Sequence, residues 1–165
     1  METASATVQG VGPDSQALRT GSSLMVIGAV AFIGYAILFF ILNFTSFLEL
    51  GIGDEQVDVG EDQIEAFSPS LHDYVSHLHI ALSGFIAATG LAAALLSWYG
   101  VRRGYTWAWV AAVAVPVLAL AVALPSHYPY GLDTFGHLGL IYLATAIFIV
   151  GAALSGKALL DEQTR

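Results

Sequence analysis

Four long stretches of apolar residues dominate the chain and predict four helices that cross a membrane. A helix needs about 20 predominantly apolar residues to cross a hydrocarbon core about 30 Å thick, and each stretch reaches that length. The stretches run over residues 23–48, 74–100, 105–124 and 135–156. The pattern therefore predicts an all-α fold, a four-transmembrane-helix bundle that forms a single domain.

Polar segments separate and flank the apolar stretches. Residues 1–20 are expected to form a disordered tail, and residues 49–71 an acidic loop between the first two helices. A very short turn joins the second helix to the third, and residues 158–165 form a second tail. The transmembrane domain is therefore expected to span residues 21–157.

Composition supports a membrane protein and excludes several kinds of chemistry. Of the 165 residues, 56% are hydrophobic and only 11% are charged, whereas a soluble domain carries about 25% charged residues. The chain has no cysteine, which excludes disulfides, thiolate zinc sites and iron–sulfur clusters. The net charge of −8 repels nucleic acid, which is therefore not an expected partner. The apolar stretches predict contact with the lipid bilayer, and a bundle this small suits a homo-oligomer or a place in a larger membrane complex.

The basic residues predict the orientation of the helices. Every lysine and arginine falls on one side of a four-helix arrangement: Arg19, Arg102, Arg103, Lys157 and Arg165. Loops rich in lysine and arginine stay in the cytoplasm. We therefore expect a multi-pass protein of the cell membrane with both termini cytoplasmic and with the histidines and the acidic loop facing outside.

Polar and small side chains follow one face of the second predicted helix. Residues seven apart nearly superpose on a helix that advances 100° per residue. The residues on this face are His72, Ser76, His79, Ser83, Gly90 and Ser97. A polar face on a membrane helix is expected to point into the bundle, and His77 is expected to point roughly the opposite way.

Glycines of the second and fourth predicted helices suit close packing between helices. These glycines are Gly84, Gly90, Gly139 and Gly151. Pro116, near the middle of the third helix, predicts a kink that either shapes the helix or flanks a cavity.

Histidines from different segments are expected to converge at the outer end of the bundle. The candidate metal ligands are His72, His79, His127, His137, Asp73 and Asp133. Three imidazoles and a carboxylate suit zinc or copper(II). His79 and His137 are also candidates for cofactor binding, because two histidines on facing helices can hold a haem b from its two sides.

Carboxylates gather at the same end as the histidines. They are Glu49, Asp54, Glu55, Asp58, Glu61, Asp62, Glu65, Asp73 and Asp133. The acidic loop lacks the spaced ligands of a calcium-binding loop, so we interpret it as solvated. The sequence contains no recognisable pairing of a nucleophile with a base and no phosphate-binding loop.

Three functions fit these observations. The first is a small integral membrane protein that acts as a non-enzymatic binding or accessory subunit, with a histidine-rich pocket at its outer face. The second is a membrane redox enzyme subunit in which the histidines hold the reactive centre. The third is a purely structural subunit whose histidines merely tolerate the membrane interface. A separate alternative for the histidines is a pH-sensing or proton-handling role.

Overall fold

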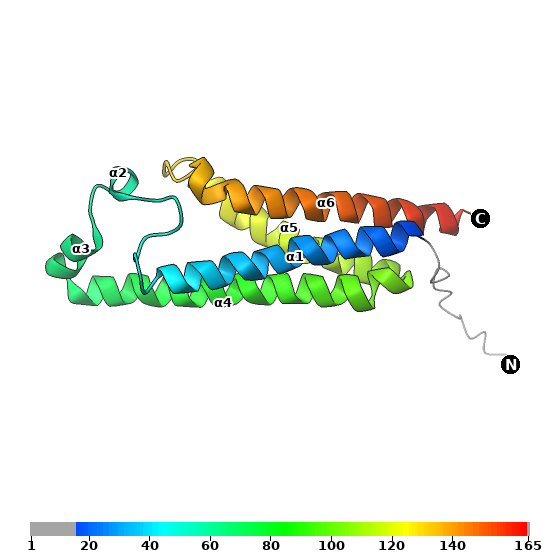
Figure 1. Cartoon of the computed structure of the whole chain (residues 1–165), viewed down its shortest axis with the longest axis horizontal. Helices are drawn as coiled ribbons and strands as arrows, with labels where there is room; N and C mark the ends of the chain where they lie inside the picture. Colours follow the sequence, from blue (N-terminus) through cyan, green and yellow to red (C-terminus); the bar gives the residue numbers. More distant parts are fainter. Residues whose placement is uncertain (1–15, 165) are drawn as a thin grey trace, which may run out of the picture.

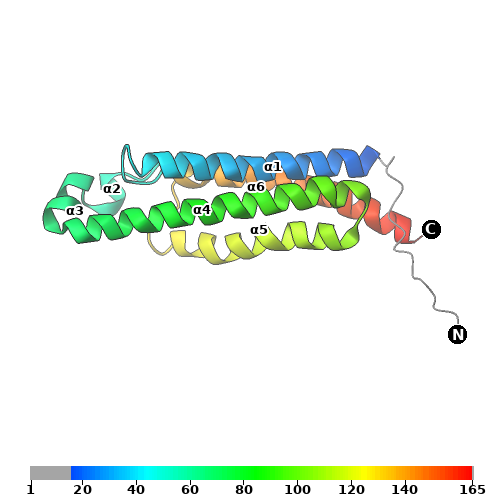
Figure 2. The same ribbon diagram turned by 90° about the horizontal axis from the view of Figure 1, so that it is seen from below.

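The computed structural model describes residues 16–164, which form an elongated bundle of long helices with two short helices at one end (Figures 1 and 2). The elements are α1 (Gln16–Leu42), α2 (Asp54–Val57), α3 (Glu61–Phe67), α4 (Pro69–Tyr99), the 3₁₀ turn η1 (Val101–Arg103), α5 (Thr106–His127) and α6 (Phe135–Gln163). Among the described residues, four helices (α1, α4, α5 and α6) are long and apolar enough to cross a membrane. The predicted all-α class with four such helices is confirmed, and these helices imply contact with a lipid bilayer.

Several helices begin or end at other residues than the expected ranges. α1 begins at Gln16, inside the expected tail, of which residues 1–15 lie outside the described part of the chain. It ends at Leu42, and residues 43–46 form a turn within the expected first span. α4 begins at Pro69, because the Ser68 hydroxyl accepts a hydrogen bond from the backbone N–H of Leu71 and proline suits the first helical position.

The four long helices run alternately up and down, with α1 at the centre of the packing. α1 packs along both α4 and α6, whereas α5 packs mainly on α4 and has few contacts with α6. Figure 2 shows α1 and α5 on opposite sides of α4. At the level where α5 approaches α6, the indole Nε1–H of Trp109 donates to the carbonyl of Ala152 at 2.9 Å.

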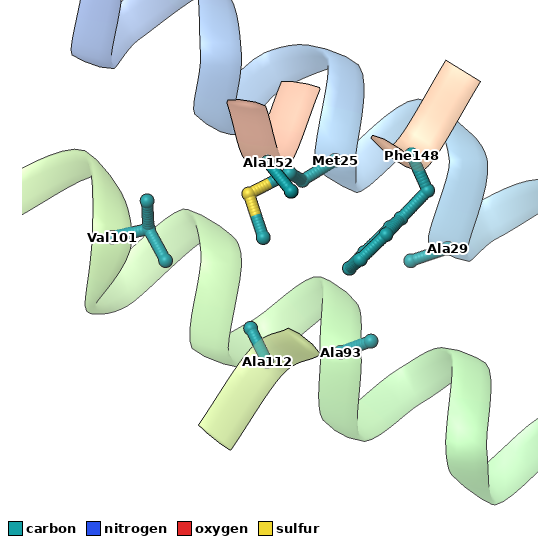
Figure 3. Packing of buried hydrophobic residues seen from close by; sticks show 7 residues of the cluster. All are labelled: Met25, Ala29, Ala93, Val101, Ala112, Phe148 and Ala152. Carbon is teal, nitrogen blue, oxygen red and sulfur yellow. The ribbon is translucent and has the colours of Figure 1, made fainter. Parts of the chain in front are cut away.

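Close helix contacts form the core in the half of the bundle that contains η1. Figure 3 shows Met25 and Phe148 at its centre, surrounded by small residues from all four long helices. A Cβ atom on Gly151 would lie 2.6 Å from both the carbonyl oxygen of Gly21 and the amide nitrogen of Met25. The backbones of α1 and α6 therefore touch here, which only glycine allows.

The glycine prediction is correct for two of its four residues. Gly90 packs against the backbone of Ala29 in α1, and Gly151 against α1 as described above. Gly84 has no atom within 4 Å of the position that a Cβ would take, and Gly139 is near only Phe135 of its own helix. Neither position therefore carries a contact between helices.

The basic residues gather at one end of the described bundle, which we call the basic end. Arg19 lies in the first turn of α1, Arg102 and Arg103 form η1, and Lys157 lies near the end of α6; these elements meet at the same end in Figure 1. The Arg102 guanidinium stacks 4.4 Å from the centre of the Trp98 ring and donates to the Ser23 hydroxyl. α2 and α3 lie at the opposite end, the histidine end.

Candidate functional site

The polar face predicted for α4 points into the bundle. Ser83, Gly90 and Ser97 are buried, and the side chains of His72 and His79 are 22% and 15% exposed. His77, by contrast, is exposed. The prediction that His72 and His79 share the inner face, and that His77 points away from it, is confirmed.

Three of the predicted histidines meet at the histidine end. Glu49, from the segment after α1, lies between two of them: its Oε2 is 3.1 Å from Nε2 of His137, and its Oε1 is 3.8 Å from Nε2 of His79. The centres of the His127 and His137 rings are 5.1 Å apart. Residues from α4, α5, α6 and the segment after α1 therefore form one cluster, which we call the Glu49–histidine cluster (Glu49, His79, His127 and His137).

The three histidines lie at similar heights along their helices when measured from the basic end. Each lies about 20 residues, or about 30 Å of helix, from an aromatic or basic residue near the basic end: Tyr99, Trp107 and Lys157. That distance equals the thickness of a hydrocarbon core. The cluster therefore lies at the level of one membrane boundary when the opposite residues lie at the other.

Glu49 reaches the cluster because the chain turns back into the bundle after α1. The helix stops at Leu42, and the side-chain amide of Asn43 donates to the Ser76 hydroxyl of α4 at 2.9 Å. Phe47 is 1% exposed and has a φ angle of 60°, and its ring stacks on His72 with centres 4.4 Å apart. A left-handed conformation is unfavourable for phenylalanine, so tertiary packing holds this turn in place.

The same segment is tied to the beginning of α6. The Thr134 hydroxyl donates to the carbonyl of Gly51 at 2.9 Å, and Nδ1 of His137 lies 3.0 Å from the carbonyl oxygen of Leu50. Gly51 has a φ of +72°, and its Cα packs against Gly136 too closely to admit a side chain. Residues 47–51 therefore close the histidine end of the bundle, and we call them the closing segment.

A cavity of about 570 Å³ is lined by residues of all four long helices and ends at the Glu49–histidine cluster. It is open to the outside of the bundle along exposed residues of α4 and α5 such as Phe85 and Val122. Its walls are mostly apolar: Phe32, Phe39, Leu82, Phe85, Ile86, Pro116, Leu118, Ala119, Leu120, Val122, Ala123, Leu132 and Ile141. Glu49, His127 and His137 line its polar end, and Tyr35, Thr89 and Ser126 add hydroxyl groups. Pro116 is buried and lines this cavity, so the alternative in which it flanks a cavity is the correct one.

The remaining predicted ligands lie outside the cluster. Nε2 of His72 lies 3.2 Å from Oε1 of Glu61 in α3, and the buried Phe47 ring contacts both His72 and His79. The side chain of Asp73 is 86% exposed, and Asp133 is also exposed. The six predicted metal ligands thus do not form one group. Within residues 16–164, no set of three or more histidine, aspartate or glutamate side chains is arranged to hold a metal ion.

The geometry also bears on the prediction that His79 and His137 hold a haem b between them. The Nε2 atoms of both rings face the same carboxylate, one oxygen each. An iron bound by both nitrogens requires that carboxylate to leave the space between the rings. The two histidines are close enough to act together, and Glu49 is the group that joins them.

Glu49 is the site residue that the sequence-based ligand set omits. It stands among many outer carboxylates, and its spacing from the histidines carries no motif. One signal distinguishes it: it follows directly on the apolar stretch, after the polar residues Asn43, Thr45 and Ser46. Those residues favour a turn, which returns the carboxylate towards the helices.

Comparison of the chain with protein-family models, with curated proteins and with solved structures finds no match. The function is therefore inferred from the geometry of the site.

Proposed function

We propose that the protein is a multi-pass membrane protein with its basic end in the cytoplasm and its histidine end outside. The support is the position of Arg19, Arg102, Arg103 and Lys157, which the fold gathers at one end. Lysine and arginine are retained on the cytoplasmic side of membranes. On this proposal the acidic segment with α2 and α3 is extracellular.

We further propose that it is a non-enzymatic binding protein for a lipid-soluble small molecule with a polar head. The single observation that carries this function is the cavity: about 570 Å³, walled by apolar side chains and ending at Glu49, His127 and His137. Pockets of 300–1,000 Å³ that combine apolar walls with a few polar groups are typical of small-molecule sites. The polar groups lie at the membrane boundary, where the head of such a molecule also lies.

Co-purification with matched cavity variants tests this function. Ala119 and Ala121 are both exposed residues of α5, but only Ala119 lines the cavity. Ala119→Phe places a ring in the cavity and obstructs it, and Ala121→Phe adds the same ring away from the cavity. We expect solvent extracts of the wild type and of Ala121→Phe to contain the same lipid-soluble molecule in near-stoichiometric amount, and extracts of Ala119→Phe to lack it. Equal content in both variants contradicts a cavity ligand.

Binding of a metal ion or haem is the second candidate. It is favoured by the hydrogen bond between Nδ1 of His137 and the Leu50 carbonyl, because metal-bound histidines are commonly oriented by such a bond. A visible absorption spectrum and elemental analysis of the same purified sample test it. A Soret band, or stoichiometric zinc, copper or iron that is lost in His137→Ala, favours this candidate. A colourless, metal-free sample that also contains no small molecule favours the structural subunit.

A further inference from the structure

We propose that the cavity is filled from the bilayer, by an acyl chain of a membrane lipid that enters sideways along α4 and α5. This inference rests on the proposed binding function and names the ligand class and its route of entry. It follows from the way the cavity is bounded: the fold covers both of its ends along the bundle and leaves one side open.

The packed core covers the end of the cavity that points towards the basic end. Phe32, Thr89 and Pro116 line this end. Each lies about one helical turn from an alanine of the buried core; these alanines are Ala29, Ala93 and Ala112. The same alanines surround the centre of the core in Figure 3. A ligand that comes from the basic end therefore has to pass through close-packed helices.

The closing segment covers the opposite end of the cavity. Its Phe47 side chain is buried, and the backbone of Gly51 lies against that of Gly136 too closely to admit a side chain. The hydroxyl of Thr134 and the ring of His137 attach the segment to the beginning of α6. Water at the histidine end therefore meets a folded segment that is fixed to the bundle.

The open side of the cavity is apolar and lies below the membrane boundary. Phe85 of α4 and Leu118 and Val122 of α5 line the cavity and are 72%, 68% and 72% exposed. Phe85 lies six residues from His79, and Val122 lies five residues from His127, both towards the basic end. These separations correspond to about 7–9 Å of helix. The opening therefore lies in the hydrocarbon layer when the Glu49–histidine cluster lies at the membrane boundary.

This opening is continuous with the surface of the bundle that contacts lipid. α4 and α5 are two of the four helices that are long and apolar enough to cross a membrane, and hydrocarbon covers their exposed apolar side chains more favourably than water does. The cavity extends along α5 from Pro116 to His127, which is about 16 Å of helix. Its length therefore follows the helices, as acyl chains do in a bilayer. A lipid can insert one chain through the opening and keep its polar head beside the cluster.

Photolabelling of the full chain in lipid nanodiscs tests the inference, with α1 as the readout. The probe is a phosphatidylcholine that carries a diazirine in the middle of one acyl chain. Phe32 and Phe39 are buried and line the cavity (the buried pair), whereas Ile37 and Phe40 of the same helix are exposed and do not line it (the exposed pair). We expect labels on both pairs, because a chain in the cavity reaches the buried pair.

Two variants of α5 test the route. Val122 lines the opening, whereas Val117 is 56% exposed and lies outside the cavity. Val122→Trp should obstruct the opening and lower the ratio of labels on the buried pair to labels on the exposed pair several-fold. Val117→Trp should keep the ratio of the wild type. An unchanged ratio in Val122→Trp means that the chain enters elsewhere and overturns the route.

The remaining outcomes separate this inference from the binding function. Labels on the exposed pair alone overturn the acyl-chain ligand. The cavity function then still stands if extracts of the wild type contain a molecule that extracts of Ala119→Phe lack, and it fails as well if the two extracts are equal. If Phe85 and Val122 escape labelling while the exposed pair is labelled, a second copy of the chain covers the opening, which also overturns the inference.

Discussion

The two ends of the bundle are built in different ways. At the basic end, helix backbones touch through glycines, and Met25 and Phe148 fill the space between small residues. At the histidine end, the helices line a cavity of about 570 Å³ that is open along exposed residues of α4 and α5, and a folded-back segment with polar contacts covers its end. One end is close-packed, and the other is held by individual hydrogen bonds.

The difference shows how a small membrane bundle combines stability with an internal site. Lipid is as apolar as leucine, so helices in a membrane associate through close packing and hydrogen bonds. The glycine contacts between α1 and α6 supply that packing at the basic end. The histidine end then tolerates a cavity, because its closing segment and polar contacts hold the helices in register there.

The largest effect is expected from a methyl group at the tightest helix contact. Gly151→Ala places a Cβ 2.6 Å from two backbone atoms of α1, so the helices must separate. We expect a loss of about 2 kcal/mol in the free energy of unfolding, measured by denaturation in mixed micelles. Gly34→Ala is the control, because nothing lies within 4 Å of its Cβ position. Equal effects of the two changes would show that the basic end is not close-packed.

A smaller and more local effect is expected from His137→Leu at the histidine end. The change removes the hydrogen bond to the Leu50 carbonyl and leaves that acceptor without its partner. We expect a loss of about 1–2 kcal/mol and faster amide hydrogen exchange in residues 47–51, with exchange at the basic end unchanged. His77→Leu should leave exchange in these residues as in the wild type. Unchanged exchange in His137→Leu would mean that other contacts hold the closing segment.

The tie between α5 and α6 provides the next test. Trp109→Phe removes the indole donor to the Ala152 carbonyl and keeps an aromatic ring. We expect a loss of about 1 kcal/mol in the free energy of unfolding, again from denaturation in mixed micelles. Trp107 is 62% exposed and serves as the matched site. If Trp107→Phe is as damaging, interfacial anchoring rather than the hydrogen bond holds α5.

The smallest effect on the free energy of unfolding is expected from a change at an ion pair outside the cavity. Glu61→Gln weakens the pair between Glu61 and His72, whose atoms are 3.2 Å apart on partly exposed side chains. We expect about 0.5 kcal/mol or less, decreasing further with added salt, because exposed pairs are screened. Thermal unfolding at low and high ionic strength measures it. A loss above 1 kcal/mol would show that α3 supports the closed histidine end.

Patterns within single segments were sufficient to predict the four long helices and the face of α4 that points into the bundle. Apolar length predicted the four long helices, since hydrocarbon thickness sets that length. The helical repeat predicted that His79 points into the bundle and His77 away from it. The meeting of His79, His127 and His137 was also predicted, because all three lie at the ends of predicted spans on the side opposite the basic residues.

Contacts between segments distant in the sequence could not be predicted from such patterns. Gly84 and Gly151 look alike in sequence, and only the packing of α1 against α6 separates an open position from a tight one. His72 belongs to the same helix face as His79, yet the buried Phe47 ring stacks against it and Glu61 pairs with it. Neither outcome is encoded within one helix.

The sequence by itself determined the number of long helices and the inner face of α4, because these depend on hydrocarbon thickness and on the helical repeat within one segment. Only the tertiary structure decided that Glu49 joins His79 to His137 and that a cavity ends at this cluster. The closing segment turns back through a left-handed Phe47 and is tied to Thr134, 83 residues further along the chain from Gly51. Its position depends on contacts with α4 and α6 together, and these contacts exist only once the helices have packed.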